Sequence, residues 1–207
     1  MIRTLCILAL LTPSLLFSQD FEGKIIFSVT YASQDSISKV PSHFKNQTIT
    51  EYISDDRIRI DQSSSIGNQV SVYRANDSTY FILLNAEDSK IAITMSKEFA
   101  VSTGKKVPKI KYKWKSRNIA GFKCKLAIVT YPNEEPIEVY YTKEISPTVN
   151  QKFEGLKGYP LLFYFVIDNV IEYHSAVSLE VKELEDDLFE IPEGYKVMTL
   201  EEFQRGL

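Results

Sequence analysis

Polar and apolar residues alternate along most of this chain, and the longest alternation covers residues 171–182. Its odd positions are mostly apolar and its even positions mostly polar. Neighbouring side chains of a β-strand point to opposite faces, so this period of two predicts one long strand with a buried and a hydrated face. His174 is then expected on the hydrated face, as a surface residue. The odd positions expected to face the interior are Ile171, Tyr173, Val177 and Leu179.

Similar but shorter runs recur along the chain, separated by brief polar segments that contain Gly, Pro, Asn and Asp. Strands are predicted at 21–31, 48–53, 57–62, 69–74, 79–84, 90–95, 109–117, 122–131, 137–142 and 161–167. This spacing predicts a mainly β protein with minor α, built on a single curved antiparallel sheet. The run 79–84 is apolar on both faces, so its second face requires a cover.

Three segments have helical signals. Residues 96–104 are expected to form a helical turn that stops at Gly104, and 142–157 one or two short helices after Ser146-Pro147. The pattern Thr199-Leu200-Glu201-Glu202 matches a capping box, which predicts a short C-terminal helix.

The first eighteen residues have the pattern of a secretory signal peptide. Arg3 precedes an apolar run that is too short to span a bilayer, and Ser18 is the expected cleavage point. The alternative is an uncleaved anchor. The expected organisation is therefore a signal peptide at 1–18 and a single domain at 19–207, located in the periplasm or secreted, with no transmembrane segment in the mature chain.

Few residues suggest chemistry. Cys124 is the only cysteine after cleavage and lies between apolar neighbours, which favours a buried small hydrophobe over a reactive thiol. His43 and His174 come from distant segments, whereas a metal site usually needs three or four ligands. No nucleophile, phosphate-loop or metal motif is present in the sequence. We therefore expect a non-catalytic protein with no cofactor and no metal.

Charge is unevenly distributed. Loss of Arg3 with the signal peptide changes the formal charge from −3 to −4, which gives no case for nucleic acid as a partner. No acid lies between Phe99 and Asn133, whereas residues 180–202 contain nine acids and two lysines. Four lysines form a stripe on one face of a predicted strand: Lys109, Lys111, Lys113 and Lys115. The stripe is either a solvated face or a docking surface for an acidic partner or an anionic lipid headgroup.

The aromatic content is high, with twelve Tyr and twelve Phe, mostly in predicted strands. The interior of a curved sheet must be filled by side chains, by a covering helix or by an apolar ligand. If a ligand fills it, the candidate residues are those of the long strand named above together with Phe27, Val29, Ile82, Tyr112 and Trp114.

Several short motifs resemble one family. FEGKIIFSV (21–29), DDRIRID (55–61), AGFKCK (120–125), KGYPLLF (157–163) and FEIPEGYK (189–196) look like the DUF4412 family of exported bacterial proteins, seen especially in Bacteroidetes-type genomes. GLKGYPL (155–161) is also similar to the related GLPGLI-type proteins. The family is similar in turn to the LolA/LolB-like lipoprotein carriers, although this chain lacks the lipobox cysteine of LolB-type carriers.

The resemblance implies an antiparallel half-barrel whose concave face is covered by short helices. The carriers hold acyl chains between sheet and helices and are not enzymes. The expectation is an exported binding protein, a monomer, that takes a lipid-like or hydrophobic ligand in the half-barrel cavity. The alternative is a cell-envelope module that docks an envelope protein through the lysine stripe.

Overall fold

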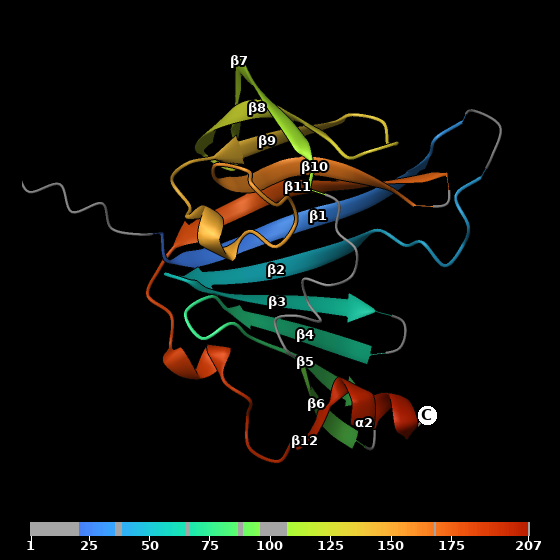
Figure 1. Ribbon diagram of the computed structural model, residues 1–207, viewed down its shortest axis with the longest axis vertical. Helices are drawn as coiled ribbons and strands as arrows, with labels where there is room; N and C mark the ends of the chain where they lie inside the picture. Colours follow the sequence, from blue (N-terminus) through green and yellow to red (C-terminus); the bar gives the residue numbers. More distant parts are fainter. Residues whose placement is uncertain are drawn as a thin grey trace, which may run out of the picture.

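The computed structural model describes residues 21–35, 39–64, 67–86, 89–95, 107–167 and 169–206 (Figure 1). The expected signal peptide and the helical turn expected at 96–104 lie outside these residues. The described strands are β1 (Gly23–Ser33), β2 (Gln47–Ser54), β3 (Arg57–Ser64), β4 (Gly67–Arg74), β5 (Thr79–Ala86), β6 (Ser89–Met95), β7 (Lys109–Ile119), β8 (Phe122–Thr130), β9 (Ile137–Thr142), β10 (Tyr159–Ile167), β11 (Val170–Val181) and β12 (Lys196–Thr199).

All twelve strands belong to one large, curved and unclosed sheet, which confirms the mainly β prediction. The strand order is β12-β6-β5-β4-β3-β2-β1-β11-β10-β9-β8-β7. Two antiparallel meanders, β2–β6 and β7–β11, are joined where β1 pairs with β11. The prediction of a purely antiparallel sheet is wrong at one edge, because β12 pairs with β6 in parallel.

The segment 143–158 covers one face of the sheet, which we call the first face. Its apolar residues Ile145, Val149, Phe153 and Leu156 are buried in one cluster with side chains of β1, β2 and β8–β10. The helices expected at 142–157 reduce to a single 3₁₀ turn, η1 (Pro147–Val149), with Ser146 as its N-cap. The cover is therefore mostly irregular backbone.

The opposite face, which we call the second face, has its own smaller core. Val72, Phe81, Leu83 and Ala92 of β4–β6 pack there with Leu184 and Phe189. The segment that supplies this cover contains the 3₁₀ turn η2 (Asp186–Phe189) and follows β11. Alternation within β2 separates the two cores, since Ile53 belongs to the first and Tyr52 to the second. The run 79–84 was expected to need a cover on its second face. For Phe81 and Leu83 that cover is the segment with Leu184 and Phe189.

A tight turn separates β7 from β8, and the expected start of the C-terminal helix is confirmed. Ala120 and Gly121 both have positive φ, 49° and 88°, as a two-residue turn between β7 and β8 requires. The helix α2 (Leu200–Arg205) begins with a capping box in which Thr199 and Glu202 satisfy each other's backbone amides. Within the described residues, no helix has the length and hydropathy that a membrane span requires.

Candidate functional site

The residues proposed for a cavity are not brought together. Phe27 and Val29 are buried in the core of the first face, where protein side chains surround them. Ile82 lies half-buried on β5, and Tyr112 and Trp114 lie on β7. Because β5 and β7 lie toward opposite ends of the molecule, these residues do not line one site (Figure 1).

The alternation in β11 has the opposite parity to the one expected. Its buried residues are Val170, His174 and Ala176, at even positions. Ile171, Tyr173 and Val177 therefore do not point into the core, and Tyr173 and Val177 are 40% and 58% exposed. The prediction that these three side chains face the interior is therefore wrong.

A β-bulge explains part of the error. Ile26 pairs with Ser178 but Phe27 pairs with Ala176, so Val177 is an extra residue that reverses the alternation. Beyond the bulge Leu179 pairs with Ile25 and packs against the first core, as expected.

The surface assignment of His174 is also wrong. Its ring stacks on Phe163 at 4.7 Å between centroids and an interplanar angle of 12°. Its Nε2 lies 2.5 Å from Glu172 Oε1. Nearby, burial is the main cause that raises the pKa of Tyr31, and the charge of Glu172 adds to it. In the sequence, Glu172 and His174 look like surface residues. The ring that buries His174 belongs to Phe163, which is on the neighbouring strand β10.

The strand β7 has two different roles along its length. The Tyr112 hydroxyl donates to Gly155 O at 3.3 Å and accepts from Lys157 N at 3.1 Å, so this residue holds the covering segment. Trp114, two residues further on, is fully exposed. The four lysines of the predicted stripe are exposed as well.

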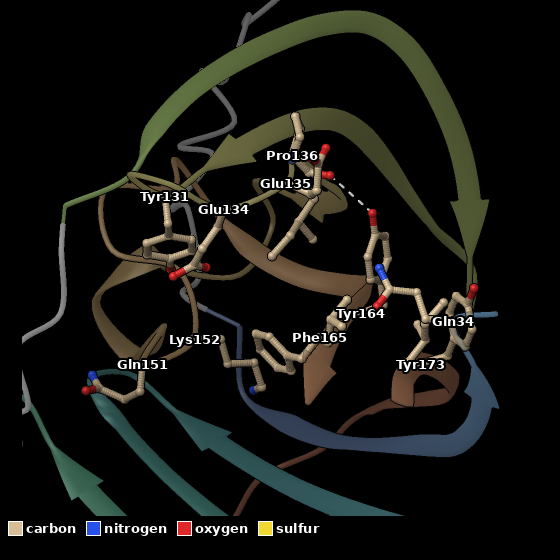
Figure 2. A pocket seen from close by; sticks show the side chains of 13 residues that line it. Gln34, Tyr131, Glu134, Glu135, Pro136, Gln151, Lys152, Tyr164, Phe165 and Tyr173 are labelled. Atoms are coloured by element: carbon tan, nitrogen blue, oxygen red, sulfur yellow. Dashed lines mark hydrogen bonds between the residues drawn. The ribbon is translucent and has the colours of Figure 1, made fainter. Parts of the chain in front are cut away.

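A groove of about 980 Å³ lies beside β10 and β11 (Figure 2). It is lined by Gln34 after β1, by residues of the β8–β9 turn, by Gln151 and Lys152 of the covering segment, and by side chains of β10 and β11. Its aromatic residues are Tyr131, Tyr164, Phe165 and Tyr173, and its aliphatic ones include Ile137, Val166 and Ile171. Two residues proposed for the cavity, Ile171 and Tyr173, therefore lie in this groove.

Tyr164 and Tyr173 are neighbours across the β10–β11 pair, with ring centroids 5.8 Å apart. The Tyr164 hydroxyl donates to Pro136 O at 3.2 Å, which ties β10 to the β8–β9 turn (Figure 2). These contacts fix one ring of the groove, while Val166 and Tyr173 stay 46% and 40% exposed. The groove thus presents apolar surface with amide, carboxylate and ammonium groups nearby, an arrangement that suits an amphipathic molecule.

Lys152 connects the groove to a buried polar cluster on the first face. Its Nζ donates to Glu51 Oε1 at 2.7 Å and to the Tyr159 hydroxyl at 2.9 Å. The Tyr159 hydroxyl donates in turn to Glu51 Oε2 at 2.5 Å. Complete burial, followed by the charge of Glu51, raises the pKa of Tyr159 well above its ordinary value. Rings of Phe27, Tyr159 and Phe163 surround the ammonium at 4.9–5.9 Å.

Local sequence places Lys152 for this contact. Asn150 follows η1, and its Oδ1 accepts from the backbone amides of Lys152 and Phe153 at 3.1 and 3.2 Å. This Asx turn directs Phe153 into the core and Lys152 toward Glu51. Sequence reasoning missed the cluster, because Lys152 and Glu51 are 101 positions apart.

Cys124 is buried, as predicted. Burial is the main cause that raises the pKa of its thiol to about 11, which disfavours the reactive thiolate. Across the described residues, no group of three or more His, Cys, Asp or Glu side chains could hold a metal ion.

Comparison with known proteins reveals similarity of fold. No family model and no curated protein matches the sequence. The solved structure of PNGF-II in its C2 crystal form is similar to this chain with a TM-score of 0.54 and 14% identity, over 88% of this chain and 32% of that one. An uncharacterized conserved protein from Thermus thermophilus has a TM-score of 0.51 and 10% identity, over 86% and 91% of the two chains.

MucB is a weaker match, with a TM-score of 0.44 and 12% identity over 85% of this chain and 59% of that one. That score is too low to establish a common fold. This chain spans about a third of the length of PNGF-II. At these identities, the similarities to PNGF-II and to the Thermus protein show a shared fold and nothing about activity.

Proposed function

We propose that this protein is an exported, non-catalytic binding protein that holds an apolar or amphipathic ligand in the groove beside β10 and β11. The observation that carries the proposal is the groove itself, which is large, aromatic and only partly covered by the protein's own side chains. Its volume of about 980 Å³ lies at the upper end of the usual range for small-molecule sites.

This proposal differs from the sequence expectation in the position of the ligand. The first face is covered by the protein's own segment 143–158, whose Phe153 and Leu156 fill the space above the sheet. The groove lies at the margin of that segment, where Lys152 reaches it. The ligand therefore rests against Tyr164, Val166 and Tyr173 rather than among the buried residues Phe27 and Val29.

Membership of the DUF4412 family, and with it a LolA-like half-barrel, is part of the same proposal. The motif AGFKCK spans the β7–β8 turn and the start of β8, and FEIPEGYK overlaps the end of η2. The apolar run before Ser18 supports export to the periplasm or secretion. The high pKa and burial of Cys124 support a role in which this thiol is not a nucleophile.

Native mass spectrometry and lipid extraction of the purified protein test whether it retains a ligand. A fluorescent fatty acid serves as the probe for affinity, with Val166→Asp and Tyr173→Asp as groove variants. Burying such a side chain contributes about 1.5–3 kcal/mol, so each variant should weaken probe binding roughly 10-fold to 100-fold.

Val197→Asp is the matched control, because Val197 is also exposed but lies on β12 at the far edge of the sheet. The control should bind the probe like the unaltered protein. Purified protein that carries no ligand and binds the probe equally in all three variants would reject the proposal.

A further inference from the structure

The β7–β8 hairpin is a strongly basic end of the molecule. It contributes seven exposed cations, namely Lys109, Lys111, Lys113, Lys115, Arg117, Lys123 and Lys125. None of the seven makes an ion pair with another described residue. Residues 107–133 contain no acid at all. Such a concentration of unneutralised charge attracts an anionic partner.

The acidic part of the chain lies at the opposite end. In Figure 1 the β7–β8 hairpin is at one end of the long axis, while η2, β12 and α2 lie toward the other. Residues 180–202 contain nine acids and two lysines. Two of these acids are neutralised by ion pairs, Asp186 with Arg57 and Glu190 with Arg74, whereas the cations of the hairpin have no such partner among the described residues. The basic hairpin is therefore the end of the molecule that would turn toward a negative surface.

The hairpin also exposes an aromatic side chain with no role in packing. Trp114 is the single tryptophan of the sequence and is fully exposed between Lys113 and Lys115. An indole combines an apolar ring with a polar N–H, which is why tryptophan concentrates at the boundary between lipid and water. The lysines suit anionic headgroups, and the indole ring suits the upper acyl region just below them.

The geometry of β7 argues against an added peptide strand. Tyr112 pairs with Ala127 and Ser116 pairs with Lys125, so Lys113, Trp114 and Lys115 stand opposite Leu126 in a bulge. A bulge and lysines on an edge strand are devices that prevent strand addition. Trp114 lies within this bulge.

From this combination we infer that the β7–β8 hairpin is a docking surface for an anionic lipid bilayer, with Trp114 entering the interface and the lysines contacting headgroups. The inference does not depend on a ligand in the β10–β11 groove, since the residues involved are different. It assigns the lysine stripe to a membrane rather than to a protein partner.

Tryptophan fluorescence provides a direct test, because all indole emission comes from Trp114. The protein is titrated with vesicles of phosphatidylcholine alone and with vesicles that also contain phosphatidylglycerol. A blue shift and protection from acrylamide quenching are expected with the anionic vesicles only. Added salt should weaken this binding, because it screens exposed charges.

Each lysine near an anionic surface strengthens binding about fivefold, so Lys113→Gln with Lys115→Gln should weaken it about 25-fold. Lys45→Gln with Lys196→Gln removes the same charge from exposed positions elsewhere and should bind normally. Trp114→Ala should weaken vesicle binding in a flotation assay while leaving the circular dichroism spectrum unchanged.

Three outcomes would overturn the inference. The first is a Trp114 emission spectrum that does not change when anionic vesicles are added, whether or not an acidic protein changes it. The second is equal binding by the two double variants, and the third is equal binding to neutral and anionic vesicles. Either of these last two would show that the basic hairpin is not the contact surface.

Discussion

Replacing Lys152 with Met should destabilise this protein strongly, since Lys152 neutralises a buried carboxylate. Its Nζ lies 2.7 Å from Glu51 Oε1, and the Glu51 side chain is 2% exposed. Removing one partner of a buried ion pair typically costs about 3–5 kcal/mol, because the other charge is left without compensation. Methionine keeps the length of the side chain and packs well against aromatic rings, so the loss reports mainly on charge. For a domain of this size, the expected fall in Tm is roughly 6–20 °C.

A double-mutant cycle separates the pair from its surroundings. Glu51→Gln preserves an acceptor for the Tyr159 hydroxyl and should cost less than Lys152→Met, because the Lys152 side chain is 16% exposed and can reach water. The double variant Glu51→Gln/Lys152→Met contains neither charge and should be more stable than Lys152→Met alone. Urea unfolding followed by circular dichroism gives each free energy of unfolding.

The control is Lys45→Met, at an exposed position, which should change stability by no more than about 0.5 kcal/mol. The reasoning fails if Lys152→Met costs less than about 1 kcal/mol. It also fails if the two single losses simply add in the double variant, because the two side chains would then not be coupled.

Two further predictions concern pH and backbone. Burial raises the pKa of Tyr159 well above 10, whereas an unfolded tyrosine loses its proton near 10. The folded state thus binds more protons above about pH 10, so the free energy of unfolding should fall as pH rises. As pH rises above about 10, the urea midpoint of Tyr159→Phe should fall less steeply than that of the unaltered protein. Equal dependence on pH in the two proteins would contradict this. Gly158→Ala should cost about 3 kcal/mol or more in thermal unfolding, since the added Cβ would lie 2.1 Å from Thr142 O at a φ of 153°. Gly206→Ala, which meets only ordinary contacts, should stay within about 1 kcal/mol; equal losses would count against the argument.

Much of the secondary structure follows from local pattern. Alternation identified most of the strands, and Thr199 with Glu202 predicted the start of α2. Cys124 was correctly placed inside from its apolar neighbours. These features depend on backbone conformation and on residues close in sequence, so the sequence contains the relevant information.

The candidate site was much less predictable. Ile171 and Tyr173 were proposed to line a cavity on the interior face of the sheet, whereas they line the open groove beside β10 and β11. The Glu51–Lys152–Tyr159 cluster joins β2, the covering segment and β10, and no spacing in the sequence indicates that they meet. The full exposure of Trp114 was likewise not visible in the sequence, since it depends on whether another segment covers this part of β7.

Sequence alone was enough to establish a mainly β chain of short strands, because the period of two is a property of each strand. Which face each strand buries was settled by pairing, since one extra residue at Val177 changes the parity without changing the pattern. The covers over the two faces and the parallel β12–β6 edge were also settled in three dimensions. The physical reason is that these contacts join residues distant in the chain, and their energy depends on mutual fit rather than on local preference.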